Sequence, residues 1–174
     1  MAKLAFLGMG VMGYPMAGHL AAKGHDVTVY NRTFSKAEAW VKQHGCAAAK
    51  TPREAAAGAD IVFACVGNDD DLRSVVLGDD GALAGMAIDT IFVDHTTTSA
   101  TIAIEMANAA KELKIGFVDA PVSGGQAGAE NGLLTVMCGG DQTTYNRVEE
   151  AINCFSKSCR LMGEQGAGQL TKMV

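Results

Sequence analysis

A glycine-rich turn near the start of the chain has the spacing of a site that binds phosphate groups. Gly8, Gly10 and Gly13 follow a short apolar run in the pattern G-x-G-x-x-G. The first glycine permits a tight turn, the second lets the backbone approach a diphosphate, and the third lets a helix pack closely. An ordinary turn between a strand and a helix is the alternative. The residues predicted to contact a dinucleotide through their backbone are Gly8, Met9, Gly10, Val11, Met12 and Gly13.

The residues after the second apolar segment indicate which dinucleotide this is. An acidic residue about 20 positions beyond the turn is typical of NAD sites, where it bonds the free ribose. The chain instead has Asn31, Arg32 and Thr33. Arg32 can pair with the 2′-phosphate of NADP, and no carboxylate at this strand end repels that phosphate. We expect NADP, with NAD still possible and a solvated Arg32 as the alternative. The missing acid also disfavours a methyltransferase.

A third stretch, Asp119–Gly125, contains groups that can bind a carboxylate. It follows an apolar segment and includes Ser123, Gly124 and Gly125. A serine hydroxyl beside glycine amides can hold an anion. A plain polar turn explains the spacing equally well, so this loop does not by itself identify a function.

Alternating apolar runs and segments of helical period must position these residues. Continuous apolar runs indicate strands buried on both faces, as in a parallel sheet. Helix starts are indicated by Ser35 with Glu38, a capping box, and by Thr51 before Pro52. The expected strands are Lys3–Leu7, Asp26–Tyr30, Ile61–Val66, Thr90–Val93, Gly116–Asp119, Leu133–Cys138 and Phe155–Leu161, and the expected helices include Val11–Lys23, Ser99–Lys114 and Asp141–Asn153.

This alternation predicts an α/β fold of the Rossmann type, in which a doubly wound, mostly parallel sheet carries helices on both faces. The length of 174 residues suits one domain plus an extension. We expect a dinucleotide-binding domain over residues 1–163 and the start of a further helix over residues 164–174.

Composition and charge argue against several classes of protein. The formal net charge is −5 and no basic cluster occurs, which disfavours nucleic acid as a partner. No run approaches the roughly 20 apolar residues of a membrane span. The five cysteines form no C-x-x-C pair, which favours free thiols in a reducing compartment. The histidines lack metal-ligand spacing, so no metal is expected. We expect a soluble, cytoplasmic protein.

Five motifs, taken in order, resemble those of the β-hydroxyacid dehydrogenase family. They are the glycine turn, Val66–Asp69, Asp94–Thr97, Asp119–Gly125 and Gly166–Lys172, and the similarity covers essentially the whole chain. The family includes 3-hydroxyisobutyrate dehydrogenase, tartronate semialdehyde reductase and the glyoxylate/succinic semialdehyde reductases. The resemblance implies hydride transfer between a nicotinamide and a small carboxylate-bearing hydroxy acid or semialdehyde, in a homo-oligomer.

The same resemblance implies roles for individual residues. Lys172 matches the family's catalytic lysine, which donates a proton to the carbonyl oxygen as hydride arrives and accepts it in reverse. The loop that holds the substrate carboxylate matches Ser123, Gly124 and Gly125. Thr97 matches the position that faces the nicotinamide, with Thr96 as the second choice. The loop on the adenosine–ribose side matches Val66, Gly67 and Asn68.

Two departures from the family pattern concern the end of the chain. The family has an asparagine four residues past the lysine and then an all-helical domain, whereas this sequence ends at Val174. We therefore expect a piece of a longer enzyme that binds NADP weakly and turns over little by itself. A catalytically inert cofactor-binding module is the alternative function. We also expect self-association through apolar surface on the last helix.

Overall fold

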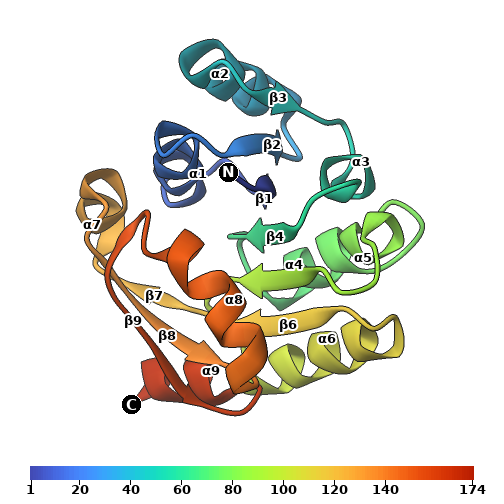
Figure 1. Cartoon of the computed structure of the whole chain (residues 1–174), viewed down its shortest axis with the longest axis vertical. Coiled ribbons are helices and arrows are strands. Elements are labelled where there is room, and N and C mark those ends of the chain that lie inside the picture. The colour runs from blue at the N-terminus through green and yellow to red at the C-terminus, as the bar shows by residue number, and fades with distance from the viewer.

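Residues 1–174, described by a computed structural model, form one nine-stranded sheet with helices on both faces (Figure 1). The strand order is β3-β2-β1-β4-β5-β6-β8-β7, and β9 pairs with β8. Pairing is parallel from β3 to β6 and between β8 and β9, and antiparallel where β8 meets β6 and β7. The predicted doubly wound, mostly parallel fold is confirmed.

The bounds of the elements agree with most of the expected segments to within a few residues. None of the helices is long and apolar enough to cross a membrane. The strands are β1 (Lys3–Leu7), β2 (Asp26–Tyr30), β3 (Ala47–Ala48), β4 (Ile61–Ala64), β5 (Ile91–Asp94), β6 (Gly116–Asp119), β7 (Val122–Ser123), β8 (Leu134–Gly139) and β9 (Ser156–Gly163). The helices are α1 (Gly13–Ala22), α2 (Phe34–His44), α3 (Pro52–Ala56), α4 (Asp69–Val76), α5 (Ala82–Gly85), α6 (Ala100–Glu112), α7 (Gly125–Asn131), α8 (Gln142–Ile152) and α9 (Ala167–Met173).

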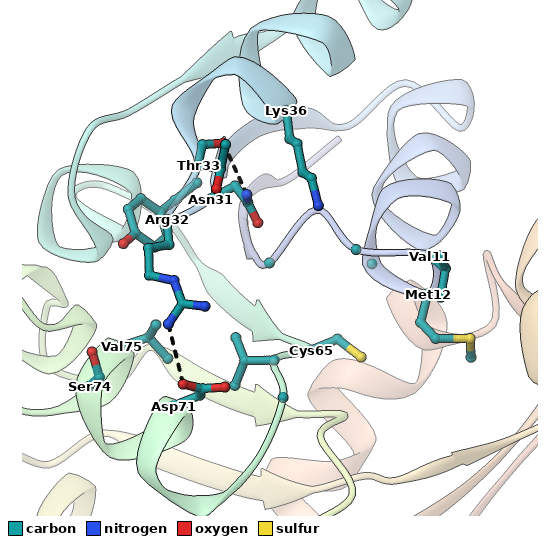
Figure 2. A pocket seen from close by; sticks show the side chains of 16 residues that line it. Val11, Met12, Asn31, Arg32, Thr33, Lys36, Cys65, Asp71, Ser74 and Val75 are labelled. Carbon is teal, nitrogen blue, oxygen red and sulfur yellow. Dashed lines mark hydrogen bonds and ion pairs between the residues drawn. The ribbon is translucent and has the colours of Figure 1, made fainter.

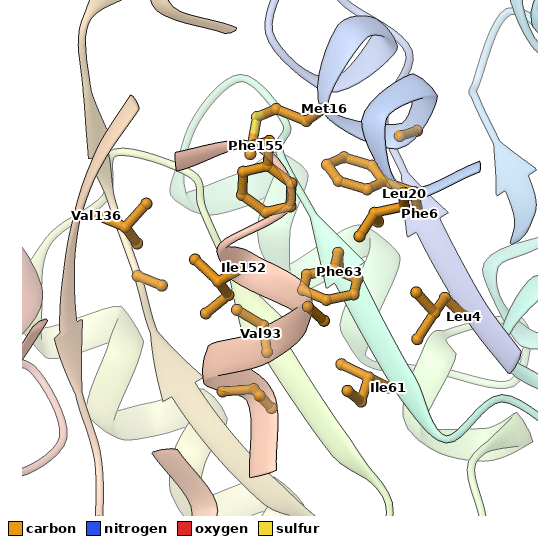
Figure 3. Packing of buried hydrophobic residues seen from close by; sticks show 14 of the residues in the cluster. Leu4, Phe6, Met16, Leu20, Ile61, Phe63, Val93, Val136, Ile152 and Phe155 are labelled. Atoms are coloured by element: carbon orange, nitrogen blue, oxygen red, sulfur yellow. The ribbon is translucent and has the colours of Figure 1, made fainter. Parts of the chain in front are cut away.

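Two apolar clusters cover the opposite faces of the sheet. In β4, Phe63 belongs to one cluster and its neighbour Val62 to the other, because successive strand residues point to opposite faces. The cluster around Phe63 includes Met16 of α1 and Ile152 of α8 (Figure 3). The opposite cluster includes Ile102 of α6. Burial on both faces explains why the central strands read as continuous apolar runs.

The glycine turn lies where the direction of strand addition reverses. β1 pairs with β2 on one side and with β4 on the other, so the chain leaving β1 enters α1 at a switch point of the sheet. Crevices at such points, outside the carboxyl ends of the strands, are the usual ligand sites of doubly wound folds. The topology therefore directs attention to the loops that follow β1, β2, β4 and β5.

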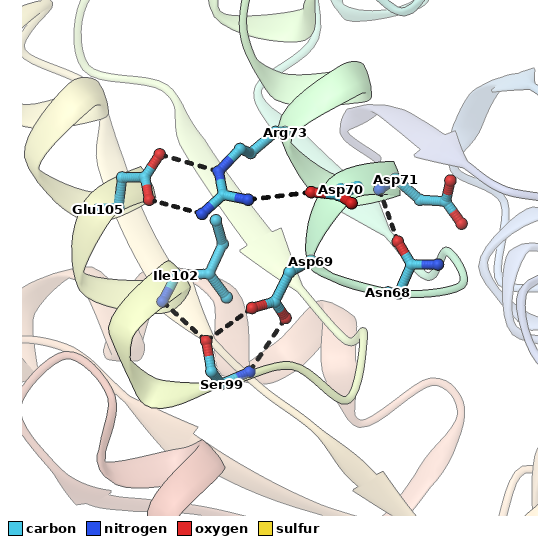
Figure 4. Close-up of polar contacts among 8 residues, drawn as sticks. All are labelled: Asn68, Asp69, Asp70, Asp71, Arg73, Ser99, Ile102 and Glu105. Carbon is cyan, nitrogen blue, oxygen red and sulfur yellow. Dashed lines mark hydrogen bonds and ion pairs between the residues drawn. The ribbon is translucent and has the colours of Figure 1, made fainter.

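Hydrogen bonds and an ion pair fasten the loop after β4 to the start of α6 (Figure 4). Asp69 accepts from the backbone N–H of Ser99 at 3.1 Å and from its hydroxyl at 2.7 Å. The same hydroxyl oxygen accepts from the N–H of Ile102 and caps α6. Arg73 of α4 forms a two-pronged pair with Glu105 of α6. These bonds keep the β4 and β5 loops, which border the candidate site, in fixed register.

Two local expectations are wrong. The capping box at Ser35 and Glu38 does not open α2, which begins at Phe34 with Thr33 as N-cap and without a side-chain cap bond. Phe34 packs against the core cluster, and that tertiary contact favours an earlier start. The glycine-rich stretch after Ser123 is also not all loop, because Gly125–Asn131 forms α7. The imidazole of His19 bonds the carbonyl oxygen of Ala129 at 2.9 Å and supports this short helix.

Candidate active site

The glycine turn combines two glycines that shape it with one that leaves it open. Gly8 has a φ of 104°, in the left-handed region that favours glycine. A Cβ atom on Gly8 would collide with the backbone oxygen of Cys65, and one on Gly13 with the backbone oxygen of Gly8. The Cβ position of Gly10, in contrast, has no heavy atom within 4 Å. Gly10 therefore leaves space in which a diphosphate can approach the backbone.

A cavity of about 390 Å³ lies beside this turn (Figure 2). We call it the glycine-turn cavity. The turn, the end of β2, the start of α2, the β4 loop and α4 enclose it, and its size suits a small-molecule ligand. Its lining residues are Gly8, Gly10, Val11, Met12, Gly13, Tyr30, Asn31, Arg32, Thr33, Lys36, Cys65, Val66, Gly67, Asp71, Ser74 and Val75.

Three charged side chains line the glycine-turn cavity, and only Arg32 was expected from the sequence. Lys36 of α2 extends toward the glycine turn (Figure 2). Its place in the first turn of the helix after Thr33 was the signal that could have identified it. Asp71 of α4 lies across the cavity, with Oδ1 3.6 Å from Nη1 of Arg32. A carboxylate thus does lie near Arg32, because the fold brings α4 to a strand end that is remote in sequence.

A second cavity, of about 420 Å³, adjoins the first. We call it the lysine cavity because Lys172 of α9 lines it. Four residues line both cavities, so an extended ligand can pass from one to the other; they are Met12, Cys65, Val66 and Gly67. The remaining residues of the lysine cavity are His95, Thr97, Val122, Ser123, Gly124, Gly125 and Lys172.

The lysine cavity brings together the residues that the family resemblance assigned to substrate. The ammonium of Lys172 donates to the backbone oxygen of Val122, immediately before Ser123. Gly124 and Gly125 have φ values of 133° and 63°, which glycine adopts without strain. An ammonium, a hydroxyl and glycine amides therefore border one cavity. Such a set can hold a carboxylate and exchange a proton with a neighbouring oxygen.

The threonines after β5 have different surroundings. Thr97 is exposed and lines the lysine cavity. Thr96 is buried, and its hydroxyl oxygen accepts from the N–H of Val66 at 3.0 Å. Thr96 thus braces the β4 loop, and Thr97 is the threonine positioned to meet a ligand. Its contact with a nicotinamide stays a prediction.

Met9 and Asn68 have bonds within the protein that the sequence did not indicate, and their contact with a cofactor stays a prediction. Met9 is buried in the core, and its N–H donates to Oδ1 of Asn31 at 2.8 Å. Asn68 lines neither cavity, since its Oδ1 accepts from the N–H of Asp71 and caps α4. Asn31 does line the glycine-turn cavity, and it braces the glycine turn by accepting from Met9 and its own loop by donating to the backbone oxygen of Thr33. Polar side chains at strand ends serve here to hold loops as well as to face the cavity.

The half-buried Cys65 and the buried His95 and Asp94 have strongly shifted pKa values. Burial raises the pKa of Cys65 to about 12, so its thiol stays protonated and is a poor nucleophile. Burial lowers the pKa of His95 to about 4. The neutral ring bonds the backbone oxygen of Ala120 through Nδ1 at 2.7 Å, while Nε2 has no partner. Burial also raises the pKa of Asp94 to about 7, opposed by the Thr96 N–H that donates to its Oδ1.

Comparisons with known proteins place the chain in a family. The model of one family, described as the NAD binding domain of 6-phosphogluconate dehydrogenase, matches residues 3–163. A curated relative from Shewanella frigidimarina (strain NCIMB 400), described as an uncharacterized oxidoreductase, is 62% identical over 100% of this chain and 60% of its own length. A probable mitochondrial 3-hydroxyisobutyrate dehydrogenase-like protein of Arabidopsis thaliana is 41% identical over 98% of this chain and 51% of its own.

A solved structure extends the similarity to three dimensions. The 3-hydroxyisobutyrate dehydrogenase of Mycobacterium tuberculosis, solved with L-serine, superposes with a TM-score of 0.93 and 34% identity over 99% of this chain and 58% of that one. The chain thus spans between 51% and 60% of the length of these three proteins. By its motifs, its fold and the matching family model, the chain belongs to the family of NAD-binding domains of the 6-phosphogluconate dehydrogenase type, and it is similar over its whole length to 3-hydroxyisobutyrate dehydrogenases.

Proposed function

We propose that the protein containing this chain is an NADP-dependent enzyme that interconverts small hydroxy acids and their carbonyl forms. The observation that supports this proposal is that Lys172, Thr97 and the Ser123 loop line a cavity that shares four lining residues with the cavity at the glycine turn. A dinucleotide on the glycine turn would extend into the lysine cavity. The candidate substrates are 3-hydroxyisobutyrate, tartronate or succinic semialdehyde, and glyoxylate. L-Serine, with which the mycobacterial enzyme was solved, is, like 3-hydroxyisobutyrate, a carboxylate with a 3-hydroxyl group.

The preference for NADP rests on the charges of the glycine-turn cavity. Its lining includes the cations Arg32 and Lys36 and the single carboxylate Asp71. Two positive charges against one negative charge favour a ligand with an additional phosphate. The ion pair with Asp71 also shows that the Arg32 side chain reaches over the cavity. Arg32, Thr33 and Lys36 are the residues that would bind the 2′-phosphate.

Each residue of the lysine cavity then has a chemical task. The nicotinamide, when bound, supplies or accepts the hydride. The Ser123 hydroxyl and the amides of Gly124 and Gly125 hold the substrate carboxylate and thereby orient the carbonyl group. Lys172, held beside this loop through the Val122 oxygen, donates the proton to the carbonyl oxygen and accepts it in the reverse direction.

The test uses the full-length protein and follows NADPH oxidation with glyoxylate, succinic semialdehyde and methylmalonate semialdehyde. We expect turnover of at least one of them. Lys172→Met should lower kcat by about 100- to 10,000-fold, the usual contribution of a general acid, with little change in NADPH affinity. Lys157→Met, at an exposed position on β9, is the matched control and should keep wild-type kcat. Absence of turnover together with absence of NADPH binding would contradict the proposal.

A second candidate function applies to the 174-residue chain by itself, as a cofactor-binding module with little activity. Thr97, Ser123, Gly124 and Gly125 are all exposed to solvent. Hydride transfer is efficient in sites that exclude water and align both reactants. We expect this chain to bind NADPH and to oxidise it with a kcat far below that of the full-length protein. Equal kcat values for the two proteins would refute this second proposal.

The remaining expectations about partners stay predictions. The net charge of −5 continues to disfavour nucleic acid. The cytoplasm is the predicted compartment, although the name of the Arabidopsis relative places that protein in mitochondria. A homo-oligomer is the predicted assembly.

A further inference from the structure

A fully buried glutamine at the start of α9 bonds the loop that carries Thr97. The side chain of Gln169 is 0% exposed. Its Nε2 donates to the backbone oxygen of Thr96 at 2.7 Å, and its Oε1 accepts from the N–H of Thr98 at 3.2 Å. A buried amide is costly unless both of its polar atoms are bonded, as they are here. The two bonds flank Thr97 and fix the spacing between its loop and α9.

A buried carboxylate at the end of β6 bonds backbone N–H groups at the same end of α9. Asp119, the last residue of β6, accepts from the N–H of Gly166 through Oδ1 at 2.7 Å and from the N–H of Gln169 through Oδ2 at 3.0 Å. One amide belongs to the N-cap residue and the other to the first turn of α9, and amides at the start of a helix have no partner within it. A Cβ atom on Gly168 would lie 2.8 Å from the backbone oxygen of Asp119, so the helix rests directly on the sheet. The start of α9 cannot shift without breaking these bonds.

These bonds determine where Lys172 is presented. Lys172 follows Gln169 by three residues, about one helical turn, and reaches the lysine cavity beside Val122. Neither Gln169 nor Asp119 lines that cavity. Both therefore act on the site only through the elements they join, namely β6, the β5 loop and α9. The hydrogen bonds connect residues between 47 and 73 positions apart in sequence.

We propose that Gln169 and Asp119 are positioning residues that set the separation between the Lys172 ammonium and the Thr97 side chain. The inference rests on the proposed function, in which Lys172 donates the proton. Loss of either tether lets α9 move relative to the β5 loop. A displacement of about 1 Å in such a site can cost about 100-fold in rate.

Gln169→Met is the direct test, because methionine has a similar length and neither an N–H donor nor a carbonyl acceptor. In the full-length protein we expect kcat to fall about 100-fold, while the Kd of NADPH changes by no more than about twofold since the glycine-turn cavity is untouched. Gln165→Met is the matched control. Gln165 also donates to a strand oxygen, that of Phe117 at 3.1 Å, but it makes no bond to the β5 loop. It should keep kcat within about twofold of wild type.

A second variant and a second measurement keep the inference testable if Gln169→Met does not fold or no substrate is turned over. Asp119→Asn keeps one acceptor oxygen and loses one of the two helix-capping bonds, so kcat should fall about tenfold, with unchanged NADPH affinity. In the 174-residue chain, the NMR signal of the Lys172 ε-methylene should shift in Asp119→Asn and Gln169→Met but not in Gln165→Met. An unshifted signal in both tether variants would overturn the positioning role even if turnover confirms the enzyme. A shifted signal without any turnover would support positioning and refute the proposed function.

Discussion

Replacing Gly10 with alanine should separate the binding role of the glycine turn from its structural role. The added methyl group meets no heavy atom within 4 Å, and Gly10 does not have a positive φ. A substitution of this kind leaves the free energy of unfolding unchanged or raises it by about 0.4–1 kcal/mol. The methyl group does, however, occupy the space that a diphosphate needs. Loss of one charge-assisted hydrogen bond, about 1.5–3 kcal/mol, weakens NADPH binding about 10- to 100-fold.

Gly13→Ala is the matched control, and it should lower the stability of the protein, whereas Gly10→Ala should weaken NADPH binding. Its Cβ atom would collide with the backbone oxygen of Gly8, so the turn must shift, at about 1–3 kcal/mol. That loss lowers Tm by roughly 2–4 °C per kcal/mol in a chain of this size. Circular dichroism melting and titration of NADPH fluorescence measure the two effects separately. If Gly10→Ala melted well below wild type, or bound NADPH as tightly, the assigned role of Gly10 would be wrong.

Three further perturbations test other parts of the structure. Arg32→Ala should weaken NADPH binding about tenfold or more and change NADH binding by less than about twofold, because only NADPH carries the 2′-phosphate; equal losses in parallel titrations would exclude this role. His95 has a folded pKa of about 4, so as pH falls from 6.5 to 4 it should lower the protein's free energy of unfolding, because the unfolded chain gains the proton first. Asp94 has a folded pKa of about 7, so as pH falls from 7 toward 4 it should raise the protein's free energy of unfolding, because the folded protein gains the proton first. Urea unfolding across this pH range should therefore show that the free energy of unfolding falls more steeply toward acid pH in Asp94→Asn and less steeply in His95→Phe than in wild type. The same pH dependence in both variants and wild type would refute both assignments. Leu170 and Met173 of α9 are 57% and 70% exposed, and we expect self-association through this apolar surface. Leu170→Glu should then increase the monomer fraction in size-exclusion chromatography. A wild type that elutes as a monomer at high concentration would contradict this expectation.

The features that could be predicted from the sequence are those encoded by neighbouring residues. The β1 strand, the glycine turn and the cap at Thr51 with Pro52 each depend on a few consecutive positions. The strand Ile61–Ala64 was recognisable because its burial on both faces leaves only apolar residues. Such patterns are sufficient to specify the fold class and the position of the turn.

The features that could not be predicted depend on contacts between distant segments. Asp71 lies near Arg32 only because α4 packs beside the strand end of β2. Met9 follows a glycine in a binding motif, yet the fold buries it, and its N–H bonds Asn31. The tethers formed by Asp119 and Gln169 span about 50 residues or more and have no local signature. Side-chain partners of this kind are set by tertiary packing, which a single sequence does not display.

The two cavities draw on very different stretches of the chain. Every residue that lines the glycine-turn cavity lies between Gly8 and Val75, whereas the lysine cavity also requires Lys172. Ribosomes add about 5–20 residues per second, so a nascent chain contains every residue that lines the glycine-turn cavity for roughly 5–20 s before Lys172, the proposed proton donor, is synthesised. A nucleotide captured during that interval would act as a folding ligand, stabilising a half-made protein before any reaction is possible.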